Sequence, residues 1–570
     1  MIAKKAQAWI VVAALIVLLM LPNFIWVINC IGDRQWDRAL IVPSLLLLFT
    51  FAIFGKRVWI ACLLLSPFAA LAPIECFYIT IYRRPSGPEV LGTVLATTPS
   101  ETLGYFGWLL FPIILGVTAG LLLALAAARM SYRTELRWSN HAREWIFAGG
   151  IILPIMVIVV GSIHGKGSLH DRSNDATHTF MVLRTPINDG YPFGVMMRFE
   201  DYWNEWNAMY VTYASLNTFR FHATELTTIK QRQIYVLVVG ESSRRNHWQL
   251  FGYQRPTNPE LMKTQNLIPI PDMVTSWPET MMAVPLLLTR KPITNKGFAW
   301  NEASILRAMQ EAGYETWWIS NQLAIGKFDS PVSTYAMEAQ HLDFVNKAGW
   351  TDSGNYDSDL LDPLRKVLAK TPQKNLFIVL HMMGSHLPYD LRYPPTFKQF
   401  TPVISEKDSS VAQGLRYQNS YDNTILYTDH ILAQIIEILG KSNAVSALWF
   451  ESDHGETLPT PTCSKSGHGI GTRYDYMIPA LFWYSGAYAT QFPDRVANLR
   501  KNADKLILSA STFESLIDMT GVEFPGHDES WSLFSPEWSY HPRIVNGFWS
   551  TDFDKAQFGK GCEIVIPATP

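Results

Sequence analysis

The hydrophobic pattern divides the chain into two parts. The first 165 residues are strongly apolar, whereas the rest mixes apolar and polar positions as soluble proteins do. A helix needs about 20 apolar residues to cross a bilayer. Five runs meet or approach that length, and no small-residue cleavage site follows the first, which we interpret as a retained helix. We therefore predict a five-helix transmembrane domain over residues 1–165, with spans at 8–28, 39–54, 58–79, 104–127 and 145–163.

Basic residues between the runs predict the orientation of these helices. With the amino terminus in the cytoplasm, the inner segments hold eight Lys and Arg residues and the outer segments hold four. The positive-inside rule favours this arrangement. An odd number of spans then puts everything after about residue 165 outside the cytoplasm, which in a bacterium with two membranes is the periplasm.

A connector is predicted over residues 166–230, where no clean hydrophobic period is visible. Residues 193–213 are amphipathic and carry Tyr202, Trp203, Trp206 and Tyr210. Such aromatics suit an interfacial helix that rests on the membrane surface. Packing beneath the soluble domain explains the same pattern equally well.

From residue 231 to residue 570 the pattern is that of an α/β domain. Apolar, strand-like runs alternate with amphipathic, helix-like runs, which favours a mostly parallel sheet covered on both faces. In such sheets the chemistry gathers beyond the carboxyl ends of the strands. The strand-like runs are 234–239, 315–319, 376–381, 447–450 and 476–483, and the helix-like runs are 302–312, 357–369, 417–439 and 510–519.

Polar side chains follow these strands where the chemistry is expected. A lone carboxylate after a strand would more often cap a turn. Two carboxylates and an imidazole at equivalent strand ends favour a divalent metal, for which they are suitable ligands. The residues at successive strand ends are Glu241, then Asn321, then His381 with His386, and then Asp453 with His454.

Thr280 is the candidate nucleophile, because it lies at a predicted turn into a helix. A threonine hydroxyl reacts poorly at neutral pH, but coordination to a divalent cation makes its alkoxide accessible. Backbone N–H groups at a helix start would also hold phosphate oxygens. A plain N-cap role is the alternative, and Thr275 and Ser276 are rival hydroxyls.

Several further residues are candidates for binding substrate. His381 and His386 flank a Gly-Ser turn and could bind a phosphate or donate a proton to a leaving oxygen. His468 lies in the loop after Asp453, and by itself it would be taken for a surface residue.

A second candidate group lies in the apolar part of the chain. Thr93, Thr97 and Glu101 are spaced four apart, which aligns them on one face of a helix. That face could receive a lipid ammonium group, although a solvated interfacial face fits the spacing equally well.

Composition narrows the choice of function. The net charge is −2 and no basic block is present, so nucleic-acid binding is not expected. The soluble part has two cysteines, Cys463 and Cys562, which could pair in an oxidising compartment.

Taken together, the motifs resemble those of the bacterial inner-membrane phosphoethanolamine transferases, over nearly the whole chain. The resemblance implies an alkaline-phosphatase-like or sulfatase-like soluble domain after the membrane helices. It is carried by the segments Val238–Arg244, Gly252–Pro259, Thr280 ahead of Val284-Pro285, Gly313–Gln322, His381–His386, Tyr421–Asn423 and Ser452–Glu456.

The resemblance also implies roles for individual residues. Zinc, as one ion with room for a second, would be held by Glu241, Thr280, Asp453 and His454, with Thr280 as the nucleophile that accepts phosphoethanolamine. His386 and His468 match histidines that contact the substrate phosphate or a second zinc, and Asn321 matches a pocket asparagine. Thr97 and Glu101 match residues associated with the donor's ethanolamine, whereas Thr93 departs from the family's usual asparagine.

The implied reaction transfers phosphoethanolamine from phosphatidylethanolamine to lipopolysaccharide. The paucity of cysteines, Thr275-Ser276 and the Trp318–Gln322 segment favour the core heptose or its phosphate as acceptor. The alternatives are a lipid A phosphate, a periplasmic glucan, or phosphoglycerol transfer from phosphatidylglycerol. A sulfatase is disfavoured because the Cys/Ser-x-Pro-x-Arg pattern is missing, and a sensor is disfavoured by the intact metal set. We expect a monomer.

Overall fold

The computed structural model describes most of the chain, and its contacts divide the chain into two compact units. It describes residues 2–568 except 30–36, 83–84, 88–89, 91–93, 95–101, 103–105, 165–186, 227–228, 298–299, 323–330, 347–354, 405–413 and 548. The helical unit comprises residues 1–95 and 108–204, and the α/β unit comprises residues 96–107 and 205–570.

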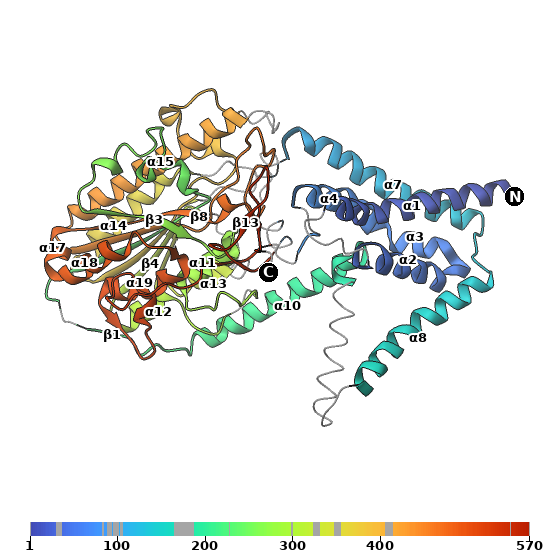
Figure 1. Cartoon of the computed structure of the whole chain (residues 1–570), viewed down its shortest axis with the longest axis horizontal. Helices are drawn as coiled ribbons and strands as arrows, with labels where there is room; N and C mark the ends of the chain where they lie inside the picture. The colour runs from blue at the N-terminus through green and yellow to red at the C-terminus, as the bar shows by residue number, and fades with distance from the viewer. Residues whose placement is uncertain are drawn as a thin grey trace. The chain divides into compact units, whose positions relative to one another are not determined.

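Helices occupy all five of the predicted apolar runs in the helical unit (Figure 1). Two described segments, Ala3–Asn29 and Gly107–Arg133, are long and apolar enough to cross a membrane. A pair bent by 65°, Ala39–Ile53 with Gly55–Leu64, could make a third span. The count of five spans therefore stays a prediction. The helices are α1 (Ile2–Asn29), α2 (Val42–Ile53), α3 (Val58–Leu64), α4 (Ser66–Tyr82), α7 (Leu110–Arg133), α8 (His141–His164) and α10 (Phe193–Leu216).

Polar contacts attach the first turns of α10 to the other helices of this unit. The Arg198 guanidinium lies 3.2 Å from Glu75 Oε1, and both side chains are buried. Asn23 exchanges two hydrogen bonds with the backbone of Tyr191, at 2.7 and 2.9 Å. The opposite face of α10 exposes Met196, Phe199 and Trp203. The exposed face is thus apolar, and the interfacial amphipathic helix stays a prediction.

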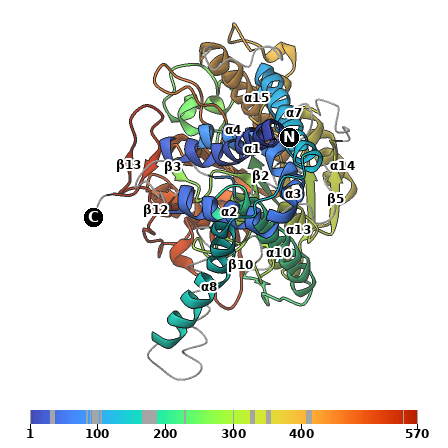
Figure 2. The ribbon, with the colours of Figure 1, turned by 90° about the vertical axis from the view of Figure 1, so that its right-hand side faces the viewer.

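An eight-stranded sheet forms the centre of the α/β unit, in the order β5-β4-β6-β2-β7-β8-β3-β9. The first five strands of this order are parallel, and β8 runs antiparallel to both of its neighbours. Figure 2 shows β5 toward one side of the sheet and β3 toward the other. The strands are β2 (Gln233–Gly240), β3 (Leu267–Val274), β4 (Glu315–Ser320), β5 (His341–Phe344), β6 (Leu376–His381), β7 (Val445–Ser452), β8 (Met477–Tyr484) and β9 (Ile507–Leu508).

Helices cover both faces of this sheet, because its central strands are apolar on both sides. On β2, Tyr235 and Leu237 join one core cluster, whereas Val236 and Val238 join the other. α12 and α19 contribute to the first cluster, and α14 and α15 contribute to the second (Figure 1). The helices are α11 (Thr280–Leu288), α12 (Ile305–Glu311), α13 (Pro331–Ala336), α14 (Leu361–Lys370), α15 (Gly414–Gly440), α16 (Arg473–Tyr476), α17 (Gly486–Gln491), α18 (Pro493–Asn502) and α19 (Thr512–Thr520).

Three small two-stranded sheets lie outside the central one. They pair β1 (Thr224–Glu225) with β10 (Val522–Glu523), β11 (Ile544–Val545) with β12 (Thr551–Asp552), and β13 (Gln557–Phe558) with β14 (Val565–Ile566).

Candidate metal centre and nucleophile

Two neighbouring parallel strands bring the metal-compatible residues together. Gly240, the last residue of β2, pairs with Ser452, the last residue of β7. Glu241 therefore lies beside Asp453, and the N–H of Ser242 donates to Asp453 Oδ1 at 3.2 Å.

Glu241, Asp453 and His454 form a tight, buried cluster. One ligand atom from each lies within 4.8 Å of the others, and all three residues are at most 2% exposed. His454 Nε2 lies 3.3 Å from Glu241 Oε1 and 3.5 Å from Asp453 Oδ2. Its Nδ1 lies 2.8 Å from the Gly455 carbonyl oxygen, which can only accept a hydrogen bond. The proton of the neutral ring is therefore on Nδ1, and Nε2 presents a lone pair to the cluster.

Thr280 joins this cluster from the start of α11. Its Oγ1 lies 3.1 Å from Glu241 Oε2 and 3.2 Å from His454 Nε2. Thr275, by contrast, donates its hydroxyl hydrogen bond to the Trp277 carbonyl oxygen, 3.3 Å away. Thr280 is the first residue of a nine-residue helix, in which the N–H groups of Met282 and Ala283 donate to the Glu279 carbonyl oxygen at 3.2 and 3.0 Å. The structure thus brings the Thr280 hydroxyl into the cluster, and its role as the nucleophile stays a prediction.

Opposing electrostatic effects act on the cluster. Burial works against the charge of Glu241, yet the hydrogen bond and charge of His454 hold the pKa of Glu241 below its ordinary value. Burial and the charge of Glu241 raise the pKa of Asp453 to about 7. Burial alone would lower the pKa of His454, but Asp453 and Glu241 raise it to about 10. Two buried carboxylates thus require a positive charge between them, and a divalent cation would replace the proton on His454.

The donor set fits a zinc ion. Among the residues that the structure describes, none forms a hydrogen bond with the buried Asp453 Oδ2, as expected of an atom that binds a metal. Two carboxylates, an imidazole nitrogen and a hydroxyl supply four ligands, the usual number for zinc.

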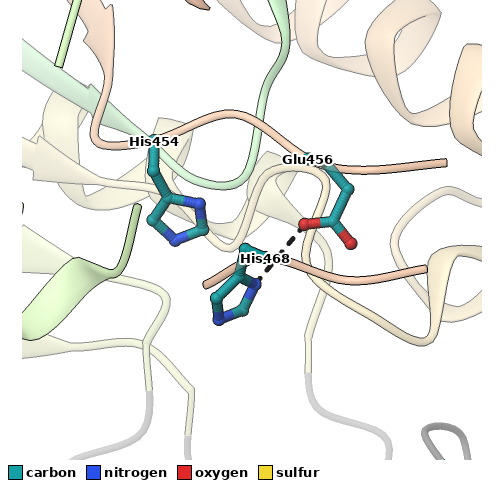
Figure 3. Close-up of side chains that lie close together, drawn as sticks. All are labelled: His454, Glu456 and His468. Atoms are coloured by element: carbon teal, nitrogen blue, oxygen red, sulfur yellow. Dashed lines mark ion pairs between the residues drawn. The ribbon is translucent and has the colours of Figure 1, made fainter. Parts of the chain in front are cut away.

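A second group of metal-compatible side chains adjoins the first. Figure 3 shows His454, Glu456 and His468 close together, and their ligand atoms lie within 4.8 Å of one another. His468 Nδ1 lies 3.4 Å from Glu456 Oε2, and the Tyr389 hydroxyl donates to Glu456 Oε1 at 2.6 Å. The His386 and His468 ring centroids are 5.8 Å apart. Glu456 was not among the predicted metal ligands, although it follows Asp453 by only three positions.

The turn that carries His386 packs directly on Glu241. The N–H of Ser385 donates to the Glu241 carbonyl oxygen at 2.9 Å. Gly384 has a φ of +51°, and an added Cβ would lie 2.7 Å from that same oxygen. Glycine is therefore required here both for its conformation and for close approach. His386 Nδ1 lies 2.7 Å from the Leu387 carbonyl oxygen, so this ring nitrogen donates to it.

Asn321 supports the same turn from the next strand. Its Nδ2 donates to Asp357 Oδ1 at 2.8 Å, and Asp357 in turn accepts from the N–H groups of Met383 and Gly384. Gln322, whose importance the sequence did not reveal, donates from Nε2 to Glu241 Oε2 at 3.3 Å. Both residues therefore reach the site through β4.

Of the remaining predicted residues, the structure describes His381. His381 is buried, its ring packs against Trp318, and burial lowers its pKa to about 4. It belongs to neither metal-compatible group found among the described residues. Thr93, Thr97 and Glu101 lie outside the residues that the structure describes.

Comparisons with known proteins agree with this architecture. A family model described as "Sulfatase" matches residues 233–522. Phosphoethanolamine transferase EptC of Escherichia coli K12 is 25% identical over 575 residues, covering 97% of this chain and 96% of the relative. The crystal structure of the periplasmic domain of Escherichia coli EptC in complex with Zn aligns with a TM-score of 0.53 and 26% identity, covering 60% of this chain and 97% of that chain.

One solved structure extends the likeness to the helical unit. It is the integral membrane lipooligosaccharide phosphoethanolamine transferase A (EptA) of Neisseria meningitidis. The TM-score is 0.66 at 20% identity, over 91% of this chain and 98% of that one. The predicted combination of membrane helices with an alkaline-phosphatase-like domain is thereby confirmed at the level of fold.

Proposed function

Because the chain belongs to the sulfatase family, and within it to the phosphoethanolamine transferases, we propose that Thr280 carries phosphoethanolamine from phosphatidylethanolamine to lipopolysaccharide. The observation that carries this proposal is the Thr280 hydroxyl, placed between Glu241 and His454 at a helix start.

Zinc is the cofactor that the proposal requires. Glu241, Thr280, Asp453 and His454 would hold it, and the Zn complex of the Escherichia coli EptC domain supports this choice of metal. When bound, zinc lowers the pKa of the threonine hydroxyl and offsets negative charge that develops at phosphorus. His454, Glu456 and His468 could hold a second ion.

In the first half of the reaction, the Thr280 oxygen attacks the phosphorus of the donor. The P–O bond to diacylglycerol breaks, and diacylglycerol leaves as an alcohol that takes up the threonine proton. N–H groups at the start of α11 hold the phosphate oxygens. His386 and His468 contact the phosphate as it transfers; their ring centroids are 5.8 Å apart, and those of His468 and His454 are 4.3 Å apart.

In the second half, an acceptor oxygen attacks the phosphothreonine. The P–O bond to Thr280 breaks, and the proton of the acceptor hydroxyl returns to the threonine. Splitting the transfer into two displacements lets one site serve two substrates that differ in shape.

The helical unit fits a lipid donor. Tethering the catalytic domain to the membrane confines the nucleophile to the surface where the scissile bond lies. We place the protein in the bacterial inner membrane with its α/β unit in the periplasm, where Thr97 and Glu101 would receive the ethanolamine group. The acceptor that we favour is the core heptose or its phosphate.

The experiment is a reconstituted transfer assay. Full-length protein in phosphatidylethanolamine vesicles should add one phosphoethanolamine to purified lipopolysaccharide, and mass spectrometry of fragments should map it to the core. Thr280→Ala should abolish transfer, whereas Thr275→Ala should retain it. Transfer by Thr280→Ala would refute the proposal. Mapping to lipid A, or activity only with phosphatidylglycerol, would replace the acceptor or the donor.

A further inference from the structure

The two cysteines of the α/β unit, whose pairing the sequence left open, form a disulfide. It joins positions 99 residues apart, Cys463 and Cys562. One lies in the loop after Asp453, and the other lies eight positions before the end of the 570-residue chain. The bond therefore connects the loop that carries His468 to the C-terminal segment.

The loop contains a small hairpin, residues Thr457–Gly467, which we call the loop hairpin. Thr457 and Gly467 exchange two backbone hydrogen bonds at its base, at 2.9 and 3.0 Å. Cys463 pairs with Thr460 at its tip. Because Glu456 precedes the base and His468 follows it, this hairpin sets those two side chains beside each other (Figure 3).

His468 lies between Gly467 and Gly469, whose φ angles are +106° and +72°. Backbone hydrogen bonds hold both glycines, since Gly467 pairs with Thr457 and the Gly469 N–H donates to the Pro278 carbonyl oxygen at 3.0 Å. Glycines in this left-handed region have many accessible conformations, so ordering them costs more entropy than ordering other residues. The position of His468 must therefore be fixed by contacts made on either side of it.

The C-terminal hairpin, residues Gln557–Ile566, supplies the contacts at the loop tip. Its strands β13 and β14 pair over two residues each. Besides the disulfide, its turn approaches the loop so closely that a Cβ on Gly561, at φ +86°, would lie 2.8 Å from the Thr462 carbonyl oxygen. A hairpin whose strands pair over only two residues each is not stable by itself, so these contacts are needed to hold it.

The same hairpin also holds the far end of the loop. The N–H of Arg473 donates to the Glu563 carbonyl oxygen at 2.9 Å, and Val565 donates to Gly471 at 2.9 Å. The Glu563 carboxylate lies 3.1 Å from Arg473 and accepts from the Tyr474 hydroxyl at 3.1 Å. The C-terminal hairpin thus contacts the loop on both sides of His468, at Thr462 and Cys463 before it and at Gly471 and Arg473 after it.

We propose that the disulfide-fastened C-terminal hairpin is a positioning element of the active site, which acts through His468. This inference rests on the proposed function. The strands and α11 hold Glu241, Asp453 and Thr280 without it, whereas the loop that carries His468 is held by this hairpin on both sides of that residue, in addition to the loop's own hydrogen bonds. Opening the disulfide should therefore leave the metal in place and slow phosphoethanolamine transfer. A displacement of about 1 Å in a contacting group can cost up to ~100-fold in rate.

The test is a double-mutant cycle on full-length protein in vesicles. Cys463→Ser with Cys562→Ser is made in the wild type and again in His468→Ala, and Lys560→Ala serves as the control because it alters an exposed side chain of the same hairpin. We expect the disulfide loss to lower kcat by roughly tenfold or more in the wild type. It should cause little further loss in His468→Ala, and the zinc ion held by Glu241, Thr280, Asp453 and His454 should stay bound in every variant.

Two further measurements keep the result interpretable. Dithiothreitol should slow the wild type and leave the double serine variant unchanged. The affinity for inorganic phosphate can be measured by calorimetry without turnover. Loss of the disulfide should lower this affinity in the wild type and have little further effect in His468→Ala.

Equal losses in both backgrounds, or no loss in either, would overturn the proposal. A wild type that transfers nothing would instead overturn the proposed function, and the phosphate cycle would then decide the role of the hairpin.

Discussion

Gly384→Ala is a sharp test of how the fold positions Glu241. The new Cβ would lie 2.7 Å from the Glu241 carbonyl oxygen, 2.9 Å from its nitrogen and 3.1 Å from its Cβ. The two backbone distances are too short for real contacts, so the backbone on one side must move by several tenths of an ångström. That movement would also weaken the hydrogen bond from the Ser385 N–H to Glu241.

The magnitude follows from two separate effects. A left-handed conformation costs alanine about 1–2 kcal/mol relative to glycine. Displacing a metal ligand through its support typically costs 10–100-fold in metal affinity, or about 1.4–2.8 kcal/mol. The matched control is Gly313→Ala, since Gly313 has a φ of +92° and nothing within 4 Å of an added Cβ.

The assay is a competition titration of zinc against a chelator, together with thermal unfolding. Both variants should unfold at a lower temperature than the wild type. Gly384→Ala alone should bind zinc more weakly, by roughly 10–100-fold. Wild-type zinc affinity in Gly384→Ala would refute the claim that this turn holds a ligand in place.

Two further predictions concern the metal and pH. Removing zinc with a chelator should lower the unfolding temperature of the wild type, because free zinc at about a thousand times the Kd of the site stabilises the folded state by about 4 kcal/mol. The unfolding temperature of Asp453→Asn should not respond to the chelator. A decrease equal to that of the wild type would contradict the proposed zinc site. Burial raises the pKa of Glu338 from 4.5 to about 7, while its Oε2 accepts from the Ser304 N–H at 2.8 Å. The folded state therefore keeps a proton that the unfolded state releases, so the free energy of unfolding should fall by up to about 3 kcal/mol as pH rises from 4.5 to 7. In Glu338→Gln this part of the pH dependence should vanish in urea titrations, and a persistent slope would assign it to other groups.

The central sheet was predictable because its strands are apolar on both faces. The apolar runs of β2 and β7 predicted strands. Glu241, Asp453 and His454 follow the carboxyl ends of these strands and were therefore predicted as ligands. β3 was missed because Pro269 and Pro271 interrupt its pattern. β5 and β9 have only four and two residues, which is too short for a period to show.

The site was predictable where a residue follows a strand, and it was not where tertiary contacts decide. Gln322 follows β4, which is separated from β2 in the sheet by the single strand β6. This tertiary arrangement lets Gln322 reach Glu241. The partnership of Glu456 with Tyr389 joins residues 67 positions apart, and no local pattern marks it. The bond between Cys463 and Cys562 likewise depends on where the chain terminus returns.

The central claim is that Thr280 becomes the phosphoethanolamine carrier, and mass spectrometry of the protein tests it most directly. Full-length protein is incubated with headgroup-labelled phosphatidylethanolamine without acceptor, quenched in acid and digested. One labelled phosphoethanolamine group should appear on the peptide that contains Thr280, and it should disappear when lipopolysaccharide is added. A label on another residue, or turnover with an unmodified Thr280, would contradict the account.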